Sequence, residues 1–156
     1  MSEPDPNAKR RRWMSVLARA SAAEIEALLA GAVPLAGAAP TPAHIRLRGP
    51  EIGLVMVRGR AGGAGAPFNL GEMTVARCTV RDEAGRVGHA YVAGRDLHHA
   101  ELAAVLDAAL QDDARQDALE RMVIAPLAAA QQAARAATAG KATGTRVQFF
   151  TMANMR

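Results

Sequence analysis

The sequence predicts a single α+β domain in which helices lie at both ends of the chain and an antiparallel sheet lies between them. Three observations support this fold class. Apolar residues recur at helical spacing over residues 8–31 and 97–139, and they alternate with a period of two over residues 44–93. Prolines between residues 34 and 42 separate the first helical region from the sheet. The 156 residues are enough for one domain with its own core.

The N-terminal region is expected to form a pair of short helices after a disordered leader of residues 1–7, so that the domain covers residues 8–156. The first helix has an apolar stripe at positions i, i+3, i+4 and i+7, made by Trp13, Val16, Leu17 and Ala20. Ser21 and Glu24 have the spacing of a capping box, in which each side chain binds a free amide of the other residue. They predict the start of a second helix, which ends at Gly31.

The middle of the chain is expected to supply most of the sheet. Residues 44–48 predict a short strand, which a Gly-Pro pair at positions 49 and 50 interrupts. Residues 52–57 are apolar on both faces, and this pattern predicts a central strand covered from both sides. Residues 76–81 alternate between apolar and polar, as in a half-exposed antiparallel strand, and Val87–Ala93 is the expected hairpin partner.

The C-terminal region predicts a helical hairpin and one last strand. Asp96 is a good N-cap for a helix over residues 97–111. A second helix is expected to begin near Asp113 and to be kinked by Pro126. Residues 147–152 carry aromatic side chains on both faces and predict a strand that closes the sheet.

The composition restricts the class of protein. The single cysteine, Cys78, excludes an internal disulfide framework and is interpreted as a small hydrophobic residue on the inward face of a strand. Half of the residues are apolar but only 3% are aromatic, so the core is expected to be thin or completed by a partner. The apolar run at residues 122–130 is shorter than the ~20 residues that span a bilayer, and the basic N-terminus is too polar for a secretory signal. A cytoplasmic protein without a membrane segment is therefore predicted.

The formal net charge of +4 permits binding to nucleic acid, nucleotides or an acidic protein surface. A small helix-turn-helix DNA-binding regulator is the alternative function, supported by the basic run at residues 9–12 and the predicted helix pair. The second helix begins with Glu24 and Glu26, however, where a recognition helix presents basic or amide side chains to the groove. The scarcity of aromatic residues also weakens binding to single strands. Nucleic acid is therefore not the expected partner.

The glycine-rich loop before residue 72 is the most informative segment for function. Arg58 and Arg60 leave the apolar strand, and Gly62 and Gly63 free the backbone. The loop lacks the Gly-Lys-Ser/Thr of a Walker motif and the strand-to-helix context of a dinucleotide fingerprint. Three interpretations stay open: a long hairpin connection, a set of amides and arginines that surrounds an anionic group such as phosphate, and a loop that docks on another subunit.

Other polar residues near this loop are weaker candidates for contact with a ligand or a partner. Asn69 is a natural turn residue, whose side chain often bonds its own backbone. Glu72 and Asp96 are a possible pair of carboxylates, although the sequence gives no distance between them. Arg95 precedes the capping residue and could touch a partner or a polyphosphate. No Ser-His-Asp or Cys-His set is present in the pattern, and no residue is assigned as catalytic.

His98 and His99 are adjacent in the first turn of the helix that Asp96 is expected to cap. Adjacent positions lie about 100° apart around a helix, so the two rings do not easily share one metal ion. No metal site is therefore predicted, and contact with a ligand or partner, or a surface or capping role, stays open. A stand-alone hydrolase that uses one of these histidines is a third possibility, which is not expected because the chain lacks a complete catalytic set.

Several short motifs occur along the chain in one order. They are residues 12–13 (RW), 17–18 (LA), 47–54 (LRGPEIGL), 59–65 (GRAGGAG), 68–72 (FNLGE), 91–96 (YVAGRD) and 147–151 (VQFFT). As an ordered set over roughly residues 10–152, they resemble the PhnG family, which is the G subunit of the bacterial carbon–phosphorus lyase core complex of phosphonate catabolism.

The resemblance implies a subunit that assembles with the H, I and J subunits. With the I subunit, to which the nucleosidase-type chemistry is attributed, this machinery displaces adenine from ATP by an alkylphosphonate. The product is ribose 1-alkylphosphonate 5-triphosphate, which the J subunit cleaves with S-adenosylmethionine and an iron–sulfur cluster. The resemblance thus implies an accessory subunit that binds no cofactor itself and could contact ATP or phosphonate within the complex.

Overall fold

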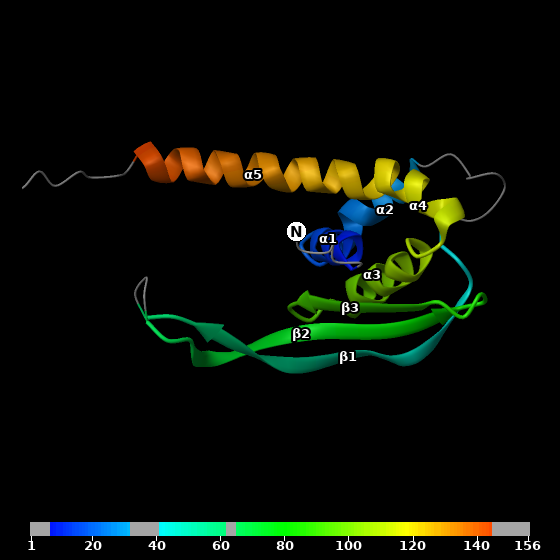
Figure 1. Cartoon of the computed structure of the whole chain (residues 1–156), viewed down its shortest axis with the longest axis horizontal. Helices are drawn as coiled ribbons and strands as arrows, with labels where there is room; N and C mark the ends of the chain where they lie inside the picture. The colour runs from blue at the N-terminus through cyan, green and yellow to red at the C-terminus, as the bar shows by residue number, and fades with distance from the viewer. Residues whose placement is uncertain (1–6, 32–40, 62–64, 145–156) are drawn as a thin grey trace, which may run out of the picture.

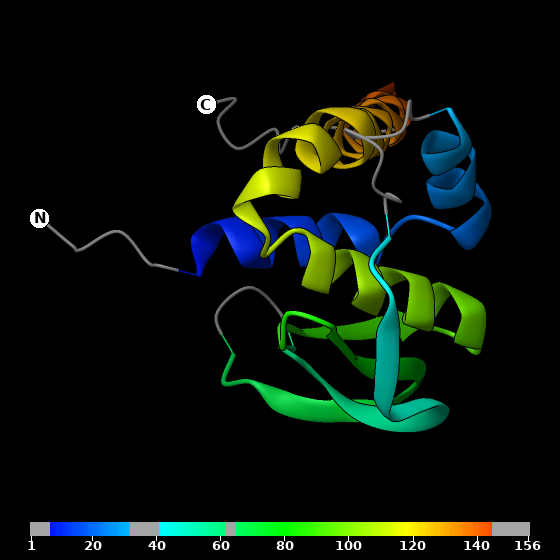
Figure 2. The ribbon, with the colours of Figure 1, turned by 90° about the vertical axis from the view of Figure 1, so that its right-hand side faces the viewer.

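A computed structural model describes residues 7–31, 41–61 and 65–144 of the chain. Its elements in order are α1 (Ala8–Leu17), α2 (Ala22–Ala30), β1 (His44–Gly59), β2 (Phe68–Asp82), β3 (Val87–Ala93), α3 (Leu97–Ala109), α4 (Asp113–Leu119), a π-helical turn (Glu120–Ile124) and α5 (Ala125–Gly144). The helices lie on one side of the sheet, with α1 and α3 between the sheet and α5 (Figures 1 and 2). The predicted α+β class is confirmed.

The helix boundaries follow the capping residues found in the sequence. The Ser21 hydroxyl accepts a hydrogen bond from the Glu24 amide at 3.2 Å, and the Ser21 amide donates to the Glu24 carboxylate at 2.7 Å. Asp96 caps α3 by accepting from the His99 amide at 2.9 Å. These local contacts satisfy amides that a helix start leaves without partners, so both predicted starts are confirmed.

The sheet is antiparallel with the order β1-β2-β3. The predicted interruption at positions 49 and 50 is wrong, because β1 continues through it with register shifts on either side of Arg48. Gly49 makes this possible: its φ is 71°, and a Cβ there would lie 2.8 Å from the Arg77 carbonyl oxygen. A residue with a side chain would be strained in this position, whereas glycine lets the strand bend and go on.

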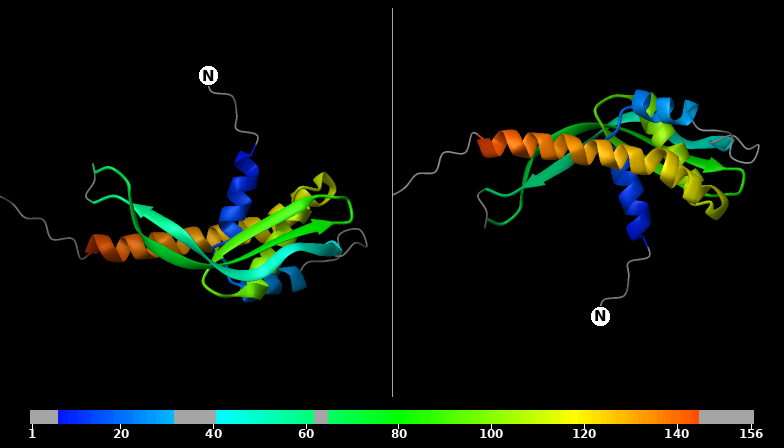
Figure 3. Two further views of the ribbon diagram at one scale, coloured as in Figure 1. Left: turned by 90° about the horizontal axis from the view of Figure 1, so that it is seen from below. Right: turned by 90° about the horizontal axis from the view of Figure 1, so that it is seen from above.

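The prediction that residues 52–57 form a covered central strand is also wrong. β1 is an edge strand, and Ile52, Leu54 and Met56 are 52%, 60% and 52% exposed. The physical reason is that β1 is outermost in the sheet, while α3 packs mainly across β2 and β3. β3 ends with Ala93 opposite Val75. Beyond that point β1 and β2 continue alone as a two-stranded ribbon (Figures 1 and 3). We call residues 54–61 and 65–74 the arm, and the rest of the described chain the body.

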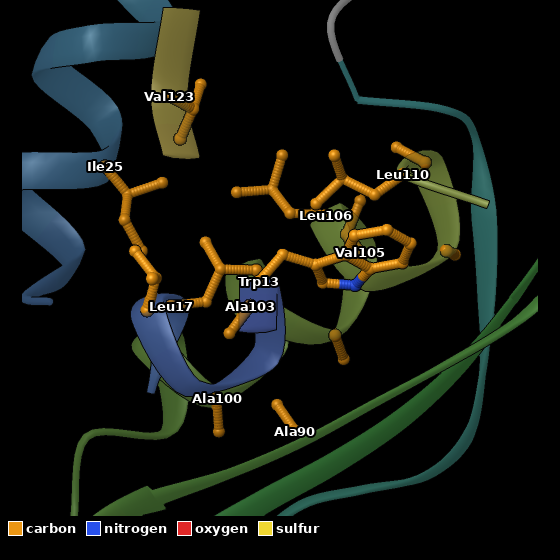
Figure 4. Packing of buried hydrophobic residues seen from close by; sticks show 14 of the residues in the cluster. Trp13, Leu17, Ile25, Ala90, Ala100, Ala103, Val105, Leu106, Leu110 and Val123 are labelled. Atoms are coloured by element: carbon orange, nitrogen blue, oxygen red, sulfur yellow. The ribbon is translucent and has the colours of Figure 1, made fainter. Parts of the chain in front are cut away.

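The core lies between the sheet and the helices. As predicted, Ala76, Cys78 and Val80 of β2 are buried, and α3 packs across β2 and β3. Gly88 of β3 allows this close packing, because a Cβ there would lie 2.0 Å from the Ala104 carbonyl oxygen of α3. Figure 4 shows how labelled side chains of α1, α2, α3 and the π-helical turn meet above this layer. Many core positions are alanine, so the helices approach closely and the core is thin.

The C-terminal helices begin at Asp113, as predicted, and are interrupted before Pro126. The Ala125 amide donates to the Glu120 carbonyl oxygen five residues earlier, which gives the π-helical turn. Pro126 has no amide proton to offer to the carbonyl of Met122, and a wider turn accommodates this missing donor. The predicted closing strand and nearly all of the predicted leader lie outside the described residues. Among the helices that the structure describes, none has the length and hydropathy to cross a bilayer.

Candidate functional site

Four of the predicted site residues lie on the arm: Arg58, Arg60, Asn69 and Glu72. Strand pairing places Arg58 opposite Asn69 near the tip. The interpretation of Asn69 as a turn residue is wrong, because pairing continues to Gly59 opposite Phe68 and the connection begins only after it. The glycine-rich loop thus joins two long antiparallel strands, as its hairpin interpretation requires.

The arm carries positive charge that no described residue neutralises through an ion pair. Arg58 and Arg60 are exposed, and neither makes an ion pair with a described residue. In the body, by contrast, Arg48 and Arg77 share the carboxylate of Glu51 at 2.6 and 2.8 Å. Gly62 and Gly63 lie outside the described residues, so that an anion site formed by their amides stays a prediction.

Arg95 lies where the body meets the arm. Gly94 has a φ of 98°, which turns the chain away from the sheet after β3. The Gly94 amide donates to the carbonyl oxygen of Thr74 at 2.9 Å and fixes this segment at the base of the arm. Arg95 is exposed and has no ion-pair partner among the described residues. Arginines without an ion-pair partner in the described part of the chain therefore occur at the base and at the tip of the arm.

The two predicted histidines serve different parts of the fold. His98 is exposed, and its Nε2 lies 2.6 Å from a carboxylate oxygen of Glu26 in α2. This hydrogen bond raises the pKa of His98 above its usual value. His99 is buried, and its Nε2 donates to the carbonyl oxygen of Leu17 at 2.8 Å. Each ring thus ties α3 to an N-terminal helix, and the rings point to different neighbours.

The carboxylates of the predicted site do not form a pair. Asp96 uses its carboxylate to cap α3, and the carboxylate of Glu72 makes no hydrogen bond or ion pair within the described residues. The described part of the chain also contains no group of three His, Cys, Asp or Glu side chains suited to hold a metal ion. These residues therefore do not assemble into one reactive centre.

A carboxylate of α3 that sequence reasoning missed binds side chains of β1 and holds this strand against α3. Glu101 accepts two hydrogen bonds from Arg46, at 2.6 and 2.8 Å, and lies 3.4 Å from His44. The bond to Arg46 lowers the pKa of Glu101. The alternation of residues 44–48 could have placed His44 and Arg46 on one face, but it could not have named their partner. A hollow of about 150 Å³ lies beside this cluster and His98.

Asp107 is the other important residue that sequence reasoning missed. It is fully buried in α3 and accepts hydrogen bonds from Arg10 at 3.1 and 2.7 Å, from Trp13 at 2.8 Å and from the His89 amide at 2.9 Å. Its sequence signal is an acidic residue with only apolar residues on either side, over residues 102–110. Arg12 also pairs with a carboxylate of the body, that of Glu120. Two cations of the basic N-terminal run are thus used internally, which weakens the DNA-binding alternative.

The body has an apolar core and pairs many of its arginines with carboxylates, whereas exposed apolar side chains and arginines without a described ion-pair partner gather on the arm. This distribution is typical of a subunit that is completed by assembly with other chains.

A family model described as "Phosphonate metabolism protein PhnG" matches residues 8–154. A curated relative from Rhizobium meliloti (strain 1021) is 45% identical over 148 residues, which cover 93% of this chain and 88% of the relative. That relative is alpha-D-ribose 1-methylphosphonate 5-triphosphate synthase subunit PhnG. The chain belongs to the PhnG family.

Proposed function

We propose that this chain is an accessory subunit of an α-D-ribose 1-methylphosphonate 5-triphosphate synthase and acts with the I subunit, in a core that also holds the H and J subunits. The observation that carries the proposal is the 45% identity, over 93% of the chain, to a subunit of that name. The geometry supports an accessory role, because the candidate polar residues are divided between helix contacts in the body and exposed positions on the arm.

The proposed reaction exchanges one substituent at C1′ of the ribose of ATP. A phosphonate oxygen forms a bond to C1′ while the bond from C1′ to N9 of adenine breaks, and the electron pair of that bond leaves with the base, which takes up a proton. The triphosphate stays on the 5′ carbon. Because ATP is the substrate, we assign this activity to the cytoplasm.

We assign no cofactor to this chain. An iron–sulfur cluster is held by several cysteine thiolates, whereas the sequence contains one cysteine, Cys78, which is buried. Radical cleavage of the product with S-adenosylmethionine then belongs to the J subunit. Any contact of this chain with ATP or phosphonate would come from its exposed arginines.

Reconstitution tests the proposal. The I, H and J subunits are expressed with and without this chain, and the release of adenine from ATP in the presence of methylphosphonate is measured. We expect the chain to co-elute with the other subunits in size-exclusion chromatography and adenine release to require it. A chain that elutes as a solitary monomer in their presence, or adenine release that is unchanged without it, would refute the accessory role.

A further inference from the structure

The arm exposes an unusual share of the apolar surface of the described residues. Five of the ten exposed large hydrophobic side chains lie on it: Leu54, Met56, Phe68, Leu70 and Met73, between 42% and 61% exposed. A sixth, Ile52, lies at its base. Alternate residues of a strand share a face, so Ile52, Leu54 and Met56 form one apolar stripe. Ile52 pairs with the buried Ala76, and the stripe therefore continues the sheet face that α3 covers in the body.

Nothing in the described chain covers this stripe. The arm extends past the end of β3, and both panels of Figure 3 show it diverging from the far end of α5. A two-stranded ribbon without a packed face is marginally stable in water. The sheet face that helices cover in the body is thus exposed in the arm. A surface that covers this face would stabilise the two-stranded arm.

The charged residues around the stripe indicate the charge of the surface that would cover it. Arg58 and Arg60 near the tip and Arg95 at the base lack ion-pair partners among the described residues, whereas Glu72 is the one described acidic residue of the arm. A second copy of this chain would bring the same arginines to the contact and would repel it. A different chain with carboxylates at these positions would be attracted.

We propose that the arm docks on another subunit of the synthase, against a surface that is apolar where it meets Leu54 and Met56 and carries carboxylates where it meets Arg58 and Arg60. The inference rests on the proposed function, which supplies the partner. It adds which part of this chain makes the contact and the chemistry of the surface that receives it.

Two variants with matched controls test the docking surface in the full chain, co-expressed with the other core subunits. Leu54→Asp places a charge in the apolar stripe, and Ile45→Asp makes the same kind of change at a similarly exposed position in the body half of β1. Arg58→Glu combined with Arg60→Glu reverses the charge at the tip. Arg81→Glu, an exposed arginine of β2 in the body, is its control. Circular dichroism and the urea midpoint of each purified variant report on folding.

We expect Leu54→Asp and the double arginine variant to weaken the affinity for the other subunits by at least about tenfold, measured by titration of the purified chain. Each control should stay within about twofold of the wild type. Assembly of Leu54→Asp with wild-type affinity would overturn the docking surface while the accessory role stands. A wild-type chain that binds no other subunit would refute the proposed function itself.

Two further outcomes would overturn the chemistry of the partner. If the double arginine variant assembles normally but adenine release falls, the arginines contact the triphosphate instead of a protein carboxylate. If the purified wild-type chain is a dimer and Leu54→Asp makes it a monomer, the stripe is covered by a second copy. Both results are read from the same proteins by adenine release and by light scattering.

Discussion

β2 passes through both regions of the molecule and shows how they differ. Its C-terminal half buries Ala76, Cys78 and Val80 under α3, whereas its N-terminal half, in the arm, exposes Phe68 and Leu70. The same contrast holds for arginines, which pair with carboxylates in much of the body and have no described ion-pair partner on the arm. The body therefore supplies most of the stability of the isolated chain, whereas the arm holds apolar surface that the described chain leaves uncovered.

The largest difference between body and arm is expected for leucine truncation. Leu106 is fully buried in α3, so Leu106→Ala removes core contacts and leaves a cavity. We expect a loss of about 4 kcal/mol in the free energy of unfolding. Leu54→Ala, at a site 60% exposed, should cost less than about 0.5 kcal/mol. Urea unfolding followed by circular dichroism measures both, and equal losses would show that the arm contributes as much to stability as the body.

The buried carboxylate of Asp107 is expected to have the next largest effect. Asp107→Ala leaves the indole of Trp13 and the amide of His89 without their acceptor, while Arg10 can partly rehydrate because its side chain is 29% exposed. The expected loss is about 3 kcal/mol. Glu83→Ala, at an exposed carboxylate in the turn after β2, is the control. A loss of less than about 1 kcal/mol for Asp107→Ala would show that the network does not stabilise the body.

Two glycines of the sheet differ in how closely other atoms pack against them. In Gly88→Ala the new methyl group would lie 2.0 Å from the Ala104 carbonyl oxygen, so that α3 must move away from β3. A loss of about 2 kcal/mol is expected. In the arm, a Cβ at Gly71 meets no atom within 4 Å, and Gly71→Ala should change stability by less than about 0.5 kcal/mol. The midpoints of thermal unfolding of the two variants test this order.

The smallest effect concerns the ion pair between His98 and Glu26. Glu26 raises the pKa of His98 above the unfolded value of about 6.5, so the pair stabilises the fold fully below that pH, and the contribution is lost as pH rises through the folded pKa. Because both side chains are more than half exposed, we expect only a few tenths of a kcal/mol. Proton NMR titration of His98 should show the raised pKa, and His98→Gln should remove the matching pH dependence. An unshifted resonance would contradict the pair.

Local sequence signals predicted the body well because its element boundaries depend on neighbouring residues. Ser21 and Asp96 start their helices through contacts within three residues, and the alternation of residues 76–81 follows directly from one covered face. Asp107 was not predicted because its partner Arg10 lies 97 residues away along the chain. No local pattern distinguishes an acidic residue that a distant arginine satisfies from one that faces water.

The arm was mispredicted for a different physical reason. An apolar strand of residues 52–57 has the same pattern whether its own helices or another chain cover it, so the sequence could not tell which of these applies. The site residues share this limitation. Arg58 and Asn69 come together only through the pairing register of β1 and β2. His98 and His99 are adjacent in the sequence, but the first ring contacts α2 and the second contacts α1.

Trp13 gives the chain a built-in optical reporter for one of its two regions. It is the single tryptophan of the sequence, 5% exposed, and its indole donates to Asp107 in the middle of the core. Its fluorescence therefore responds when the body loosens, while an event confined to the arm leaves its surroundings unchanged. Binding of a partner to the arm should leave the tryptophan emission constant, whereas unfolding of the body should shift the emission to the red. The two events can therefore be distinguished in one sample without a label.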